Sequence, residues 1–207
     1  MLRLFALTPD GGLTQSEIAR RLGLSHVAVG KQLPLLSDLL DGAAPGWRAT
    51  DRARCWDRFL AEYPGPRGLT THWAAADDVA TQLDRVERVA REQGGALPAV
   101  SGDFAADFYA PWRRPGHVVA YVTAQHPLQE HGFATVRSGE ATLELRTPRD
   151  PTILAMSREW PSTRDGASRR YADPLITASD LRGSPGGDVD SAIDQLRERT
   201  PRGPLWT

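Results

Sequence analysis

The stretch LTQSEIARRLGLSHVAVGKQL, from Leu13 to Leu33, predicts two short helices joined at a glycine. Thr14 followed three residues later by Glu17 is a capping box, which starts a helix by satisfying its first backbone amides. Gly23 favours the left-handed conformation that ends this helix. Ser25 is a preferred cap for the helix that follows. The apolar residues between these signals give each helix one side for burial.

The second predicted helix leaves most of its side chains available for contact. Val29 and Leu33, four residues apart, predict its buried side. Because a helix-turn-helix places the first residues of its second helix at base edges in the major groove, this pattern predicts a DNA-binding element. The candidate DNA-binding residues are Ser25, His26, Val27, Ala28, Lys31, Gln32 and Arg48.

Two kinds of contact with DNA are expected from these residues. His26 and Lys31 offer hydrogen bonds to base edges or phosphates. Val27 and Ala28 offer apolar contact to a thymine methyl group. Arg48 lies in the turn-rich segment GAAPGWRAT, where a wing is expected, and is a candidate phosphate contact. The alternative is a helical hairpin that serves only packing within the protein.

Length and composition allow one or two domains, and we favour two. The chain has 207 residues, 40% of them hydrophobic, and a formal charge of −1. In residues 1–72, nine basic side chains face seven acidic ones. This small excess predicts DNA binding through a few local contacts, strengthened by dimerisation or a partner. The sequence shows neither a signal peptide nor a membrane-length apolar run. We therefore expect a cytoplasmic, nucleoid-associated protein without a membrane partner.

Residues of the types that hold metals are sparse. Cys55 is the only cysteine, which argues against a thiol-ligated metal and excludes an internal disulfide. The five histidines include no pair at i, i+4 spacing, the spacing typical of a zinc site on a helix. We expect no metal and no cofactor.

Proline and glycine divide the chain into three predicted parts. Residues 1–50 are predicted to form a winged helix-turn-helix domain. Residues 51–68 are predicted to form a connecting helix and linker, because apolar residues recur at helical spacing before the segment PGPRG. Residues 69–207 form the predicted C-terminal domain.

The C-terminal part alternates predicted helices and strands, so the expected fold class is α/β or α+β with a small sheet. The apolar run over residues 117–123 predicts a central strand buried on both faces. Alternation over residues 140–146 predicts a strand with Glu140 and Glu144 toward solvent. Residues 160–170 are expected to form a surface loop. Further helices are expected after Asp77, at residues 103–110, and after Asp150, Asp173 and Asp188.

The segment SGDFAAD, residues 101–107, suggests an enzymatic alternative. A strand, a glycine turn, a helix and a second strand form the layout of nucleotidyltransferases. Two-metal phosphoryl transfer needs acidic oxygens, yet residues 117–123 contain no Asp or Glu. Asp103 and Asp107 share a helix face without a third ligand, a pattern more typical of solvated carboxylates. We therefore expect no catalytic residues and no enzyme.

Five segments of the chain resemble one protein family. They are YPGPRGLTTHW, SGDFAADFYAPWRRP, the apolar strand ending in AYV, YADPLITASDL and GGDVDSAIDQLRER. As a set they resemble the AbiEi-type antitoxins of type IV toxin-antitoxin systems, chiefly the actinobacterial branch. The resemblance covers nearly the whole chain. One departure is ITASDLRG, which is more polar than the helix that usually follows DPL in that family.

This resemblance implies an N-terminal winged helix-turn-helix and a C-terminal domain, the latter expected to resemble a catalytically inactive nucleotidyltransferase-like fold. It implies a repressor of its own operon that acts as antitoxin, or an orphan relative of one. The implied partners are double-stranded operator DNA, a nucleotidyltransferase-like toxin and a second copy of the chain in a homodimer. The alternatives are a nucleotidyltransferase-like enzyme and a protein-interaction module without DNA binding.

Overall fold

The structure, a computed structural model, describes residues 1–8, 11–43, 45–112, 114–158, 163–164, 167–184 and 188–200. Within these ranges the α-helices are α1 Leu2–Leu7, α2 Gln15–Leu22, α3 His26–Gln32, α4 Arg52–Glu62, α5 Val79–Glu92, α6 Gly102–Tyr109, α7 Pro151–Ser157, α8 Pro174–Leu181 and α9 Val189–Arg199. The 3-10 helices are η1 Leu33–Leu36, η2 Gln129–His131 and η3 Ser138–Glu140. The strands are β1 Leu40–Asp41, β2 Arg48–Ala49, β3 Gly68–Ala74, β4 Ala99–Ser101, β5 Val118–Tyr121, β6 Ala134–Thr135, β7 Leu143–Pro148, β8 Thr163–Arg164, β9 Ala167–Ser168 and β10 Arg170–Tyr171.

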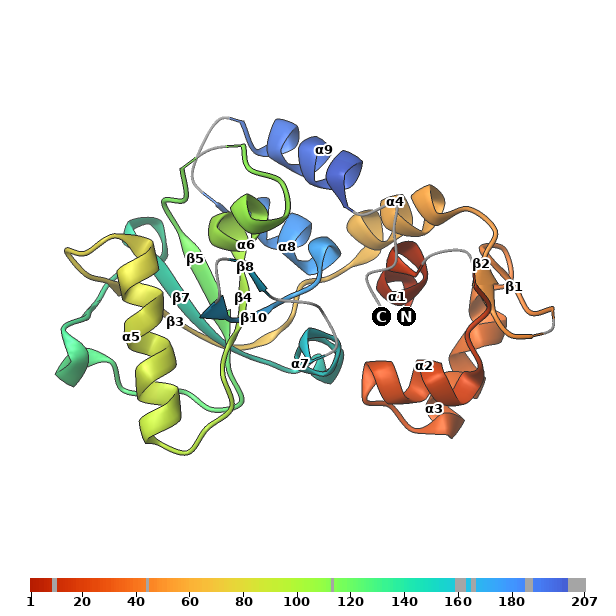
Figure 1. Cartoon of the computed structure of the whole chain (residues 1–207), viewed down its shortest axis with the longest axis horizontal. Helices are drawn as coiled ribbons and strands as arrows, with labels where there is room; N and C mark the ends of the chain where they lie inside the picture. The colour runs from red at the N-terminus through yellow and green to blue at the C-terminus, as the bar shows by residue number, and fades with distance from the viewer. Residues whose placement is uncertain are drawn as a thin grey trace.

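A mixed sheet organises the larger part of the molecule. Six of the described strands pair in the order β10-β4-β5-β7-β3-β6. β5 is parallel to β7 and β10 is parallel to β4, whereas the other neighbours are antiparallel. Figure 1 shows α5 on one side of this sheet and α6 and α8 on the other. The chain is therefore a mixed α/β protein, and this part of the predicted fold class is confirmed.

β5 is the central, fully buried strand that the apolar run predicted. Its residues Val118, Val119, Ala120 and Tyr121 are all buried. β4 pairs with it on one edge and β7 on the other. Because helices cover both faces, a strand at this position has no polar side, which explains its nearly continuous apolar sequence.

The N-terminal helices lie at the other end of the molecule. Figure 1 places α2 and α3 far from α5, with α7 beside α2 on the side that faces the sheet. α4 packs against both α1 and α8. The buried apolar side chains form one continuous cluster from α1 to α9. The two ends of the described chain thus share a core.

Two segments form strands that were not predicted. β3 was not predicted, because only Trp73 of this strand is buried and its sequence shows no clear alternation; it is a strand because it pairs along β7. Residues 163–164 and 167–168 pair with each other and Arg170 begins β10 where a loop was expected. Residues 160–162 and 165–166 of that predicted loop lie outside the described residues.

The prediction that Glu144 of β7 faces solvent is wrong, because this side chain is 8% exposed. Glu140 is exposed as predicted, but it lies in η3 before the strand begins. The guanidinium of Arg146 bridges two carboxylates, with Nη2 2.6 Å from Glu144 and Nη1 2.6 Å from Asp180 of α8. His117 Nε2 lies 3.4 Å from the other oxygen of Glu144. The alternation of apolar and polar residues correctly separated the two faces of this strand. The polar face, however, carries a buried cluster of ion pairs that α8 covers.

Asp180 explains why the segment ITASDLRG is polar although its helix is buried. Its carboxylate accepts hydrogen bonds from Ser101 Oγ at 2.6 Å and from Tyr121 Oη at 2.9 Å, besides the ion pair with Arg146. Burial raises the pKa of Asp180, although Arg146 and the two hydroxyl groups oppose that rise. The polar residue in α8 therefore has partners on three strands of the sheet.

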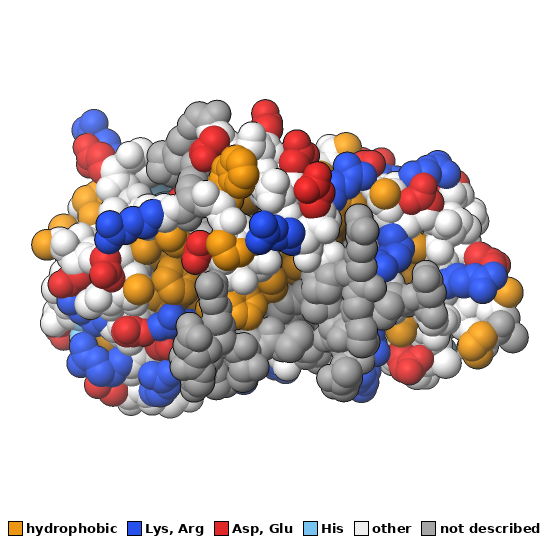
Figure 2. All heavy atoms as spheres, turned by 45° about the horizontal axis from the view of Figure 1, so that its top comes forward, with side chains coloured by type: hydrophobic (Ala, Val, Ile, Leu, Met, Phe, Trp, Pro, Cys, Tyr) orange, Lys and Arg blue, Asp and Glu red, His pale blue; other side chains and the backbone are white. Residues whose placement is uncertain are grey.

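Charges of both signs are mixed on one face of the molecule. On the face shown in Figure 2, Lys and Arg side chains lie among Asp and Glu side chains without forming a large patch of one sign. None of the described helices has the length and apolar character required to cross a bilayer.

Candidate nucleic-acid interface

The capping signals of α2 are present as predicted. Glu17 N donates to Thr14 Oγ1 at 3.2 Å, and Thr14 N donates to Glu17 Oε2 at 2.8 Å. The carboxylate of Glu17 accepts from both the backbone N and the Oγ1 of Thr14, and these two hydrogen bonds, the backbone one first, lower its pKa. Gly23 ends the helix in the left-handed conformation, with φ of 62°. The start and the end of α2 are thus set by three residues that the sequence identified.

α3 begins with the predicted serine cap. Ser25 Oγ accepts a hydrogen bond from Ala28 N at 3.1 Å. Val29 is fully buried, and Leu33, directly after the helix, is 1% exposed. Val27 is 65% exposed, and His26, Lys31 and Gln32 are also exposed. The helix therefore has one anchored side and one side open to contact.

Gln15 is a member of this site that the sequence analysis missed. From the first turn of α2 its amide Nε2 reaches the carbonyl of His26 at 2.8 Å and the ring Nδ1 of His26 at 3.1 Å. Gly30 leaves room for it, because a Cβ there would lie 2.7 Å from Gln15 Nε2. No local spacing rule predicts this contact, since it depends on how α2 and α3 cross.

A short hairpin follows α3 and joins the start of α2. β1 and β2 pair antiparallel. Leu13 and Trp47 add a further bridge, with Leu13 N donating to Trp47 O at 2.7 Å and Trp47 N to Leu13 O at 2.8 Å. Gly46 permits this approach, because a Cβ there would lie 2.6 Å from the Leu13 carbonyl. The hairpin is therefore fixed to the helices through the segment that precedes α2.

Arg48 lies on this hairpin and holds an acidic partner. Its Nη2 lies 2.7 Å from Asp41 Oδ2, and its side chain is 59% exposed. The two residues face each other across β1 and β2. An exposed pair of this kind contributes only about 0–1 kcal/mol to stability. The guanidinium can therefore exchange Asp41 for another anion at small cost.

The segment at residues 101–107 is built into the core. Ser101 Oγ donates to Asp180, and Gly102 starts α6 with φ of +70°. Asp103 is 5% exposed, so the expectation that it is solvated is wrong. Among the described residues no group of three or more His, Cys, Asp or Glu side chains is placed to hold a metal ion. Burial raises the pKa of Cys55 to about 11, which keeps its thiol protonated at neutral pH.

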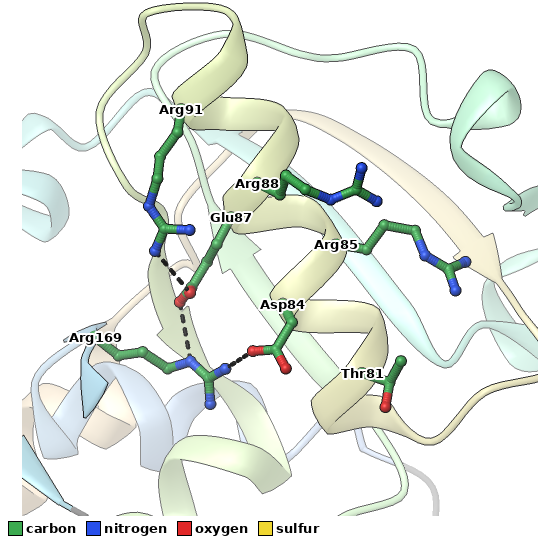
Figure 3. A pocket seen from close by; sticks show the side chains of 7 residues that line it. All are labelled: Thr81, Asp84, Arg85, Glu87, Arg88, Arg91 and Arg169. Carbon is green, nitrogen blue, oxygen red and sulfur yellow. Dashed lines mark hydrogen bonds and ion pairs between the residues drawn. The ribbon is translucent and has the colours of Figure 1, made fainter. Parts of the chain in front are cut away.

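A groove beside α5 collects six charged side chains. It has a volume of about 650 Å³ and is lined by Thr81, Asp84, Arg85, Glu87, Arg88, Arg91 and Arg169. In Figure 3, Arg169 points between Asp84 and Glu87, and Arg91 also reaches Glu87. Arg85 pairs with Asp77, and Arg88 with Glu92. The lining itself has four arginines and two carboxylates, and Asp77 and Glu92, which lie outside it, bring the two charges into balance.

Comparison of the chain with protein-family models, with curated proteins and with solved structures gave no match.

Proposed function

We propose that this protein is a DNA-binding transcriptional regulator and that residues 1–50 form a winged helix-turn-helix. The observation that carries the proposal is the division of α3 into two sides. Val29 anchors the helix in the core, while Val27, Lys31 and Gln32 remain exposed and Ser25 caps the first turn. This is the arrangement in which a second helix enters the major groove with its first residues at base edges.

The hairpin supports the winged form of this motif. Its two strands form a small sheet, and the bridge from Leu13 to Trp47 joins this sheet to the segment that precedes α2. In the proposed complex Arg48 contacts a phosphate, for which it releases the weakly held Asp41. Because the chain as a whole carries a charge of −1, we propose a homodimer on two half-sites, which doubles the number of phosphate contacts.

The antitoxin role rests on the sequence resemblance described above. In this proposal residues 51–68 connect the DNA-binding domain to a C-terminal domain, residues 69–207, that resembles an inactive nucleotidyltransferase. In the proposed fold, Ser101 corresponds to the turn that would hold phosphate in a nucleotidyltransferase, and its hydrogen bond to Asp180 supports the proposal of an inactive domain. The protein then represses its own operon and opposes a nucleotidyltransferase-like toxin encoded beside it.

Fluorescence anisotropy with labelled fragments of the upstream region tests the DNA-binding function. We expect saturable binding that weakens as salt increases, and much weaker binding to a scrambled fragment of equal length. Equal affinity for both fragments, or no salt-sensitive binding at any protein concentration, would refute the proposed function. Co-purification with the product of the neighbouring reading frame tests the antitoxin role separately.

A further inference from the structure

The orientation of the Gln15 amide is fixed by its two contacts. The carbonyl oxygen of His26 accepts only, so the Gln15 atom 2.8 Å from it is the NH₂ nitrogen. The same nitrogen lies 3.1 Å from Nδ1 of the His26 ring. Nδ1 therefore accepts a hydrogen bond, and in the neutral ring the proton resides on Nε2. Gln15 thus selects one tautomer of His26.

Gly30 indicates that this contact shapes the helix. Glycine in a helix interior costs about 0.5–1 kcal/mol relative to alanine. The position is not forced by backbone conformation, because Gly30 does not have a positive φ. What it provides is space for Gln15 Nε2, which a Cβ would approach to 2.7 Å. Position 30 of α3 is therefore occupied by a residue of low helix propensity at the point where the Gln15 amide crosses the helix.

We propose that Gln15 is a positioning residue that aims the Nε2–H of His26 at a hydrogen-bond acceptor on DNA. This inference rests on the proposed function. His26 is the first residue of α3 and follows the Ser25 cap, so its ring lies at the end of the helix that enters the groove. A ring held at Nδ1 presents a single donor, which selects acceptors and excludes the exocyclic amino groups of adenine and cytosine.

The acceptors available to that donor are purine N7, guanine O6 and thymine O4 on the bases, and phosphate oxygens on the backbone. All of them share the same chemistry, a lone pair facing an N–H. A base acceptor gives sequence preference at one position, whereas a phosphate acceptor fixes only the position of the helix on the duplex. Chemically modified DNA distinguishes a base acceptor from a phosphate acceptor.

Nitrogen NMR of the free protein tests the contact without DNA. In long-range ¹H–¹⁵N spectra at a pH where the ring is neutral, His26 should carry its proton on Nε2 and show Nδ1 as an acceptor. In Gln15→Met, which keeps side-chain length but has no donor, the Nδ1 resonance should shift. A ring protonated on Nδ1, or an Nδ1 signal identical in the two proteins, would overturn the inference whatever the protein binds.

DNA binding provides the second test. We expect Gln15→Met and His26→Ala each to lower operator affinity about three- to tenfold, as the loss of one hydrogen bond predicts. The double variant should bind no more weakly than His26→Ala, because Gln15 acts through His26. Gln93→Met, which removes an exposed amide at the end of α5, is the matched control and should bind normally.

Additive losses in the double variant, or unchanged affinity in both single variants, would overturn the inference while leaving DNA binding itself intact. If the contact is to a base, removing one acceptor should abolish the difference between the original protein and His26→Ala: 7-deazapurine removes N7, 2-aminopurine removes guanine O6 and 5-methyl-2-pyrimidinone removes thymine O4. If it is to a phosphate, a methylphosphonate at one linkage should do so. If none of these base replacements and no methylphosphonate across the operator reproduces the loss, the acceptor assignment is wrong.

Discussion

The guanidinium of Arg3 on α1 forms a buried ion pair with Asp173 at the start of α8, with Nη1 2.5 Å from Oδ2. The two side chains are 2% and 0% exposed. The same guanidinium donates to Thr152 of α7. Because α1 belongs to the proposed DNA-binding domain and α7 and α8 to the C-terminal part, this pair joins the two parts through the core.

Replacing Arg3 with alanine should lower the free energy of unfolding by about 3–5 kcal/mol, because it leaves the Asp173 carboxylate buried without its cation. Urea denaturation followed by circular dichroism measures this loss. Arg197→Ala is the control, since Arg197 pairs with Asp57 at the surface and should cost no more than about 1 kcal/mol. A loss as small for Arg3 as for Arg197 would show that the buried pair does not stabilise the fold.

Glu144 should make the protein sensitive to acid. Burial favours its neutral form, but hydrogen bonds from His117 and Arg146 and the charge of Arg146 outweigh burial and lower its pKa to about 2. For an acid whose pKa is lower in the folded state, the stabilisation is present above the unfolded pKa, near 4.5. It is lost as pH falls toward 2, by up to about 3 kcal/mol.

Glu144→Gln tests this assignment, measured as unfolding free energy between pH 5 and about pH 2. The variant should be less stable than the original protein at pH 5 and should lose less stability on acidification. Asp180 acts in the opposite direction, because burial raises its pKa, so the comparison of the two proteins isolates Glu144. Parallel pH profiles would mean that Glu144 does not govern the acid response.

The local signals between Leu13 and Leu33 were sufficient to predict α2 and α3. The capping box at Thr14, the left-handed Gly23 and the cap at Ser25 all act within four residues, so a single sequence contains the information. The central position of β5 was predictable for a similar reason, because a strand covered on both faces needs an unbroken apolar run.

Contacts between distant segments could not be predicted in this way. Glu144 looked solvent-facing because alternation reports two faces of a strand but not what covers each face. The face that carries Glu144 is covered by α8. The ion pair that links Arg146, the partner of Glu144, to Asp180 of α8 joins residues 34 apart in the sequence. Gln15 was missed in the candidate site because its partner His26 lies on the next helix.

Gly30→Ala separates stability from DNA binding in the proposed interface. The added methyl group removes the cost of glycine in a helix, so the free energy of unfolding should stay the same or rise by up to about 1 kcal/mol. The same group displaces the amide of Gln15, so operator affinity should fall about as much as in Gln15→Met. Thermal unfolding and fluorescence anisotropy of one preparation measure both effects. Loss of stability together with affinity would point to a packing defect instead.

Lys31→Ala tests whether α3 contacts phosphate as well as bases. Lys31 is the only lysine of the chain and is exposed on α3. If its ammonium neutralises one phosphate, the slope of log affinity against log salt should decrease by about one unit, with similar losses for specific and scrambled fragments. Arg88→Ala is the control, because Arg88 lies on α5 at the opposite end of the molecule from α3 and should leave the slope unchanged (Figure 1). An unchanged slope with Lys31→Ala would remove the phosphate contact from the proposal, and a loss confined to the specific fragment would instead assign Lys31 to a base.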